Sequence, residues 1–281
     1  MKTTKRREVI GIKYLSRRVA SWIEYARALG LVLIVLLSTV SAAAWAADDA
    51  AQAPEEPSAL SEGKRMLRSV EEDFFLGRSS IADLRRRLDR SAEIFGGIEV
   101  PCEREFWTAR VSFFHAMIDE FEEQWKRAER RFEETEALAS QYVGCRSSSE
   151  GLRLLADTYS RLTKYRGIGY KAKKGPQVKT LSESAIEIDS TNSRAYLTLA
   201  LYHLHAPGIA GGSVKKALAM LHEIVDMEGL EPLDRYSVLL WLAIAHHLND
   251  DEPASRRYLD LALDMYPRNP WVNSLLDDYG L

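Results

Sequence analysis

Five of the six histidines lie in the last third of the chain, and histidine is a common ligand for transition metals. These are His203, His205, His222, His246 and His247. His203 and His205 are two residues apart and His246 and His247 are adjacent. Neither pair therefore presents both rings on one helix face, as ligands at i and i+4 would. His222 is not followed by the second histidine of a zinc-protease helix. We expect structural histidines and no bound metal.

The chain has only two cysteines, Cys102 and Cys145. They lie just before and just after a segment, 103–141, that reads as a helical hairpin. The start and end of an antiparallel hairpin are close in space, so a disulfide is geometrically feasible. Two free buried thiols are the alternative.

Patterns for catalysis are missing from the sequence. Gly167-x-Gly169-x-x-Ala172 superficially matches a dinucleotide-binding fingerprint, but it follows a predicted helix and not a strand. No nucleophile elbow or phosphate-binding loop occurs, and no carboxylate pair stands out among the 41 acidic residues. We expect no enzymatic activity and no cofactor.

The elements that position these residues follow from one apolar pattern that recurs at steps of 44 and 43 residues. Its spacing, i, i+3, i+4 and i+7, is that of one face of an α-helix. Its third position is always alanine, which lets a second helix approach closely. The three copies are Leu152, Leu155, Ala156 and Tyr159; Tyr196, Leu199, Ala200 and His203; and Leu239, Leu242, Ala243 and His246.

A fixed period of this length predicts stacked helix pairs, a solenoid. We expect an all-α fold with about five hairpins, followed by a capping helix from Trp271. Ser80 and Gly96-Gly97 are the expected start and stop signals of one of these helices. The expected hairpins are 60–97, 103–141, 150–189, 193–228 and 234–266.

The repeated pattern resembles that of the tetratricopeptide repeat (TPR) family, with Leu-x2-Leu-Ala-x2-Tyr/His in the first helix and Pro267 at the end of a unit. The resemblance places His203 and His246 at the family's core tyrosine position. It also implies a concave groove lined by first-helix residues outside the apolar stripe. That groove either holds an apolar ligand or a peptide, or is buried against other helices. The groove residues are Leu197, Leu201, Leu204, Leu240, Ile244 and His247.

Two expected hairpins carry inserted loops, 166–176 and 205–213, that share a Gly-Ile pair. Extra loops of a solenoid cluster on one edge and often bind partners. The alternative is that their prolines and glycines only fix turn geometry. The candidate binding residues are Arg166, Tyr170, Lys171, Pro207, Gly211 and Gly212.

The second loop is also similar to one in the T-components of TRAP-type solute transporters. Pro207, Gly211, Gly212 and Ala217 carry this likeness. It implies a hydrophobic ligand cavity and a partnership with a solute-binding protein or permease.

Residues 29–46 form an apolar run after eight basic and two acidic residues, and Ala44-Trp45-Ala46 is a cleavage motif. We expect 1–46 to be a signal peptide cleaved after Ala46, or an uncleaved membrane anchor. Either way the remainder is exported to the periplasm. An acidic, proline-containing linker should cover 47–59 and the solenoid 60–281. Without the leader the charge falls from −3 to about −9, which disfavours nucleic-acid binding.

The function expected from the sequence is therefore protein–protein interaction by an exported, non-enzymatic solenoid. Two alternatives stay open. One is a transporter-associated protein with an apolar ligand cavity, and the other is a membrane-anchored structural protein of the envelope.

Overall fold

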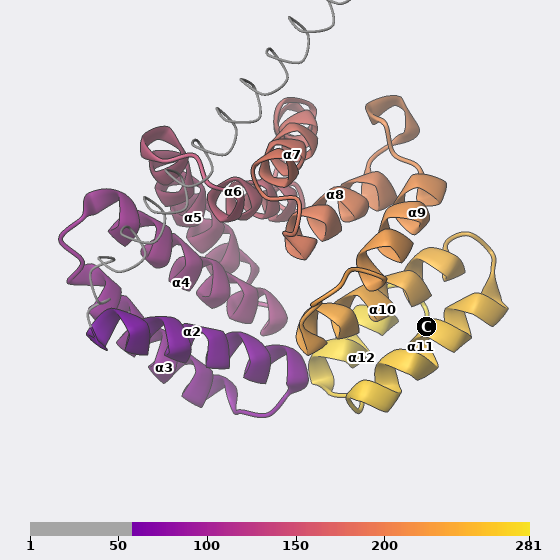
Figure 1. Cartoon of the computed structure of the whole chain (residues 1–281), viewed down its shortest axis with the longest axis horizontal. Coiled ribbons are helices and arrows are strands. Elements are labelled where there is room, and N and C mark those ends of the chain that lie inside the picture. Colours follow the sequence, from indigo (N-terminus) through magenta and orange to yellow (C-terminus); the bar gives the residue numbers. More distant parts are fainter. Residues whose placement is uncertain (1–57) are drawn as a thin grey trace, which may run out of the picture. The chain divides into compact units, whose positions relative to one another are not determined.

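The computed structural model of this chain describes residues 58–281, which belong to one compact unit that runs from Pro57 to Leu281. The expected leader at 1–46, its cleavage site after Ala46 and nearly all of the linker at 47–59 lie outside the described residues. Eleven α-helices and one 3-10 turn build the described part, and no strand occurs in it (Figure 1). The all-α prediction is confirmed. Within residues 58–281, no helix combines the length and the apolar character needed to cross a membrane.

Consecutive helices pack as five antiparallel hairpins with a final capping helix, as the repeat predicts. The hairpins are α2 (Ser58–Leu76) with α3 (Ile81–Gly96), α4 (Pro101–Phe121) with α5 (Trp125–Cys145), α6 (Ser149–Leu162) with α7 (Ile168–Ile188), α8 (Ser193–His205) with α9 (Val214–Val225), and α10 (Pro232–His247) with α11 (Glu252–Met265). The 3-10 turn η1 (Gly208–Ala210) lies between α8 and α9, and α12 (Pro270–Asp277) is the cap.

Several helices begin at capping residues that can be recognised in the sequence. The Ser80 hydroxyl accepts a hydrogen bond from the Asp83 amide at 3.2 Å, and α3 stops at the expected glycines. The Asn192 side chain accepts from the Ala195 amide at 3.0 Å, and Ser213 caps α9 in the same way. Each cap satisfies a backbone N–H that has no partner within its helix.

The recurring apolar stripe lies on α6, α8 and α10, the first helices of three hairpins, and most of its residues are buried. Its three alanines, Ala156, Ala200 and Ala243, are fully buried, so they allow the close approach that the pattern predicts. Leucines one turn away on the same stripe are also buried. The residues from which the solenoid was predicted are therefore residues of the hydrophobic core.

Residues 168–176 of the segment expected to be a loop at 166–176 are helical, and the expectation was wrong for them. α7 begins at Ile168 and continues through Pro176. Contacts with α5 of the preceding hairpin hold its first turns in place: Tyr170 donates to Glu136 at 3.1 Å and Lys174 pairs with the same carboxylate at 2.9 Å. The Lys174 ammonium also lies 3.8 Å from the centre of the Tyr159 ring. These contacts offset the low helix propensity of glycine and proline.

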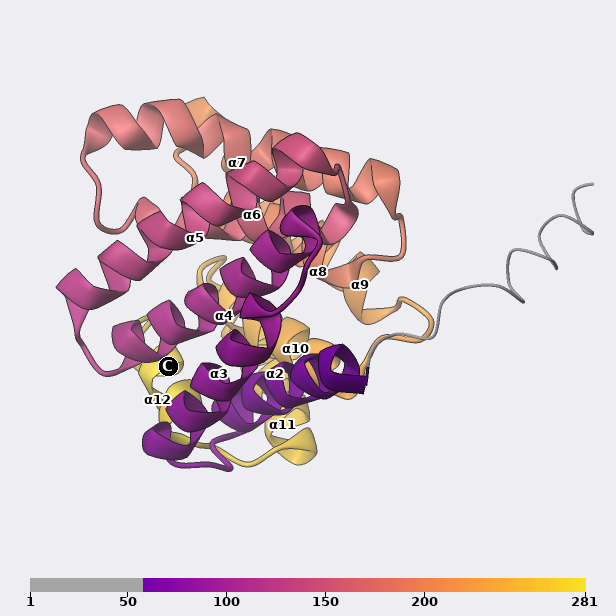
Figure 2. The same cartoon turned by 90° about the vertical axis from the view of Figure 1, so that its left-hand side faces the viewer.

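The last helix closes the stack onto the first hairpin (Figures 1 and 2). The Trp271 and Phe75 rings pack edge to face with centroids 4.8 Å apart, and the Asn269 amide donates to the Phe75 carbonyl at 3.1 Å. Gly77 has φ +61°, and a Cβ there would lie 2.8 Å from Asn269 Cβ. The two ends of the described solenoid therefore meet, and its hairpins form a closed arrangement.

The two cysteines are joined by a disulfide, with Cα atoms 6.2 Å apart. Cys102 lies in the first turn of α4 and Cys145 ends α5, so the bond ties the two ends of the second hairpin together. This arrangement agrees with the pairing that hairpin geometry makes feasible.

Candidate partner-binding pocket

A pocket of about 670 Å³ opens where the first helices of several hairpins begin. Helix α2 forms one wall, and the connections that lead into α8 and α10 form much of the rest. Most of the lining side chains are charged or polar, and none is a histidine or cysteine. The lining comprises Lys64, Arg65, Leu67, Arg68, Glu71, Trp107, Arg110, Glu150, Asp189, Thr191, Asn192, Ser193, Arg194, Met227, Glu228, Gly229, Leu230, Glu231 and Asp234.

Basic side chains from α2 and α4 gather around one tryptophan in this pocket. The Lys64 ammonium lies 4.8 Å and the Arg110 guanidinium 5.5 Å from the centre of the Trp107 ring. Cations at such distances are attracted by the negative face of the ring. Arg65 and Arg68 follow on α2 and are exposed. This side of the pocket is therefore basic.

Glu71 links three helices at the base of the pocket. Its carboxylate accepts from Arg110 of α4 at 3.4 Å and from Arg194 of α8 at 2.5 Å. Arg194 also pairs with Asp234 of α10 at 2.9 Å. Burial opposes the charge on Arg194, but these two carboxylates raise its pKa above the usual value. In Arg110 the cost of burial prevails and its pKa is lowered.

A second layer of charges lies on α6. Arg153 is buried and pairs with Glu150 at 2.9 Å and with Asp157 at 2.6 Å. Burial would raise the pKa of Glu150, but Arg153 and the amide of Asn192 lower it to about 2. Burial raises the pKa of Asp157, although Thr198 donates to it at 2.6 Å. The ion pairs lie within α6, and hydrogen bonds from Asn192 to Glu150 and from Thr198 to Asp157 connect them to the start of α8.

The connection between α9 and α10 supplies acidic groups to the same pocket. Glu228 and Glu231 are exposed there. Among the described residues, neither has an ion-pair partner, and the same is true of Arg65 and Arg68 on α2. The pocket thus presents unpaired charges of opposite sign from two different elements. Such a pocket can bind ions and polar segments.

The predicted groove residues do not line this pocket. Leu240 and Ile244 are fully buried and Leu204 is nearly so. Leu197 and Leu201 are half-buried against the same core cluster. These side chains belong to, or pack on, one core cluster that α8, α9, α10, α11 and α12 share, so they face other helices.

His247, the sixth predicted groove residue, pairs instead with Glu252 at 2.5 Å. His203 is buried and its Nδ1 lies 2.8 Å from the Gly211 carbonyl oxygen. His246 Nδ1 lies 3.2 Å from an Asp251 carboxylate oxygen. Within the described residues, no group of histidine, cysteine and acidic side chains could hold a metal ion.

The predicted loop residues have mixed surroundings. Arg166 pairs with Glu129 and Glu133 of α5, and Tyr170 is bound to Glu136, so both side chains already have partners within the chain. Lys171 is exposed. Pro207, Gly211 and Gly212 shape the turn between α8 and α9: Pro207 precedes η1, Gly211 has φ +89°, and a Cβ on Gly212 would overlap a backbone carbonyl.

Little in the sequence indicates the pocket. Arg110 lies among the apolar residues Trp107, Val111 and Phe114 of α4, and this interruption is the one visible signal. Glu71, Arg194 and Asp234 look like ordinary surface charges of separate helices, because their juxtaposition depends on contacts 40 to 123 residues apart.

Comparisons with known proteins bear on the fold. No family model and no curated protein matches the chain. Among solved structures, the chain is similar to TTC0263, a thermophilic TPR protein of Thermus thermophilus, with 15% identity, a TM-score of 0.49, and coverage of 77% of this chain and 98% of that one. It is also similar to YrrB, described as a TPR protein with an unusual peptide-binding site, with 10% identity, a TM-score of 0.37, and coverage of 75% and 90%. Likenesses of this degree concern the course of the helices, so a function must be argued from the chain's own residues.

Proposed function

We propose that this chain is a non-catalytic adaptor that binds a segment of a partner protein in the charged pocket beside α2. The TPR-like stack of hairpins supports protein–protein interaction as the general function. The observation that carries the proposal is the set of unpaired charges of opposite sign, Arg65 and Arg68 on one element and Glu228 and Glu231 on another, around one pocket.

The chemistry of such a site is ionic recognition. Acidic side chains of the partner would bind the arginines, and basic side chains would bind the two glutamates. Each exposed pair contributes about 0.2–1 kcal/mol, so several must form together, and they set orientation and association rate more than affinity. A pocket of 670 Å³ is in the range of natural ligand sites. It suits a few residues of a mixed-charge segment.

The site of action that we propose is the periplasm. The apolar run at 29–46 and the motif ending at Ala46 support export, with the leader either cleaved or kept as an anchor. The disulfide between Cys102 and Cys145 supports an oxidising compartment.

The apolar ligand implied by the T-component likeness has less support. The pocket is lined mainly by charged groups, and Leu240 and Ile244 are fully buried. We therefore do not propose a hydrophobic cargo for it.

The test is affinity capture from envelope extracts with the exported portion and three variants. Arg65→Glu/Arg68→Glu and Glu228→Lys/Glu231→Lys should each lose the captured partner. Lys126→Glu/Arg130→Glu is the matched control, because it reverses two exposed basic residues of α5 that do not line the pocket. Capture of the same proteins by both pocket variants would contradict the proposed site.

A further inference from the structure

Two isoleucines at matching places of consecutive hairpins are almost wholly exposed. Ile168 begins α7 with 83% of its surface accessible, and Ile209 lies in η1 with 102% accessible. Each follows a glycine in the connection between the first and second helix of its hairpin. Single exposed hydrophobic residues are common on protein surfaces. Two fully exposed aliphatic side chains at equivalent positions of consecutive hairpins indicate a surface that binds something.

Hydrogen bonds from buried side chains fix the turn that carries Ile209. The Tyr202 hydroxyl donates to the Ala210 carbonyl, and His203 Nδ1 lies 2.8 Å from the Gly211 carbonyl oxygen. The Ser213 amide donates to the His203 carbonyl at 2.7 Å. Two buried side chains of α8 thus fix the turn, so the exposure of Ile209 does not come from a loosely held loop.

The two isoleucines belong to equivalent connections of consecutive hairpins. Their connections join first to second helices, and such connections of stacked hairpins lie on the same side. In Figure 1, α7 and the connection from α8 to α9 both lie along the upper edge. The charged pocket is formed where first helices begin, at the other end of α8 and α10.

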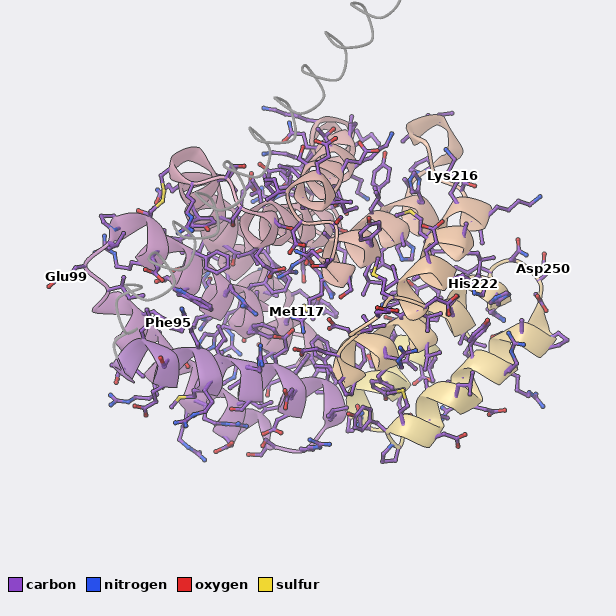
Figure 3. The ribbon with its side chains drawn as sticks, in the orientation of Figure 1. Phe95, Glu99, Met117, Lys216, His222 and Asp250 are labelled. Carbon is purple, nitrogen blue, oxygen red and sulfur yellow. A yellow bond between two sulfur atoms is a disulfide. The ribbon has the colours of Figure 1, made fainter. Side chains whose placement is uncertain are left out.

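Lysines without partners flank the two isoleucines. Lys171 and Lys173 follow Ile168 on α7, and Lys215 and Lys216 open α9 after the turn. All four are exposed, and within residues 58–281 none has an ion-pair partner. Figure 3 shows Lys216 at the start of α9, beside the projecting turn.

The α5 carboxylates beside the first turns of α7 do not cancel this charge. Glu129 and Glu133 are paired with Arg166, and Glu136 is paired with Lys174. The edge is therefore basic, although the chain as a whole carries a net charge of −3. We call Ile168, Lys171, Lys173, Ile209, Lys215 and Lys216 the isoleucine edge.

We propose that the isoleucine edge docks onto an anionic lipid bilayer, with both isoleucines in the interface and the lysines against the headgroups. Separate aliphatic tips and dispersed lysines suit a fluid, negatively charged surface, which needs no matching sockets. A protein partner would require a continuous apolar patch or a groove, and these residues form neither. The proposal is independent of the pocket and of its partner.

Vesicle flotation tests the proposal directly. The protein is residues 57–281, which include every buried cluster of the described chain and exclude the apolar run that would itself enter vesicles. We expect it to float with vesicles of phosphatidylcholine and phosphatidylglycerol, and to stay in solution with phosphatidylcholine alone or in high salt. Failure to float with the anionic vesicles overturns the proposal.

Variants separate the edge from the rest of the surface. Ile168→Ser and Ile209→Ser should each weaken binding about tenfold or more, and Lys215→Glu/Lys216→Glu about fivefold or more for each lysine. Ile188→Ser is the control, since Ile188 is 52% exposed at the far end of α7. Equal loss in Ile188→Ser, or unchanged binding in the edge variants, would show that another surface meets the lipid.

A single introduced cysteine gives a local readout, because both natural cysteines are in the disulfide. An environment-sensitive dye on Ile209→Cys should shift to the blue with anionic vesicles, whereas the same dye on Ile188→Cys should not. Circular dichroism must show the same helix content for all variants. A dye at position 209 that responds to added protein partners but not to vesicles would refute lipid docking in favour of a protein contact.

Discussion

The Glu71 carboxylate offers the sharpest test of how the pocket is held together. It is 8% exposed and bonds to Arg110 and Arg194, so it connects α2 with α4 and with a helix 123 residues further along the chain. Glu71→Gln keeps the shape of the side chain and removes its charge. Both guanidinium groups then remain in place with one carboxylate fewer.

The expected loss in the free energy of unfolding follows from the burial of the Glu71 carboxylate. Removing one partner of a buried ion pair costs about 3–5 kcal/mol. The arginine side chains are 16% and 27% exposed, so water offsets part of the loss and we expect about 3 kcal/mol. With a urea slope of roughly 2–3 kcal/mol per molar, the unfolding midpoint should fall by about 1 M.

The assay is urea unfolding followed by circular dichroism, with Glu72→Gln as the matched control. Glu72 is the next residue on α2 and is only half-buried, and we expect a change within about 0.5 kcal/mol. The double variant Glu71→Gln/Arg194→Gln should lose less than the sum of its single variants, because the two groups interact directly. A midpoint for Glu71→Gln equal to that of Glu72→Gln would refute the assignment of this carboxylate as a link between helices.

Three further predictions concern other parts of the chain. Replacing Cys102 and Cys145 by serine should lower the free energy of unfolding by about 4 kcal/mol on the chain-entropy estimate for the loop they close, measured by denaturant unfolding under non-reducing conditions. Burial, aided by Arg131, lowers the pKa of His115 to about 4 from 6.5. The unfolded state then binds more protons, so stability should fall by about 3 kcal/mol as the pH drops from 6.5 to 4, and His115→Gln should remove that part of the slope. Gly212→Ala should destabilise the turn after α8 because a Cβ there overlaps a backbone carbonyl, and hydrogen exchange should show faster exchange confined to that turn.

The repeat was readable from the sequence because it depends on local spacing. Alanine at the third position of each copy of the stripe predicts close helix pairs, and Ala156, Ala200 and Ala243 are buried where the helices meet. The disulfide could be predicted from the sequence for the same reason, because a hairpin brings its own ends together. Only the geometry of one supersecondary unit is needed for either inference.

The remainder depends on contacts between different helices, which local spacing does not encode. Gly175 and Pro176 locally predict a loop, but the contacts of α7 with Glu136 and Tyr159 make that stretch helical. The packing of Trp271 on Phe75 closes the stack across 196 positions of the chain, and no periodicity encodes it. The closed arrangement then buries leucines that an open solenoid would display in its groove, and it assembles a charged pocket from helices far apart in sequence.

The central claim is that the charged pocket binds a partner segment, and site-specific photo-crosslinking in cells tests it most directly. A photoreactive residue at position 68 should crosslink to a discrete protein, and Glu228→Lys/Glu231→Lys should abolish that product. The same residue at position 130, exposed on α5 and outside the pocket, should not give it. No product from position 68, or the same product from both positions, would contradict the account.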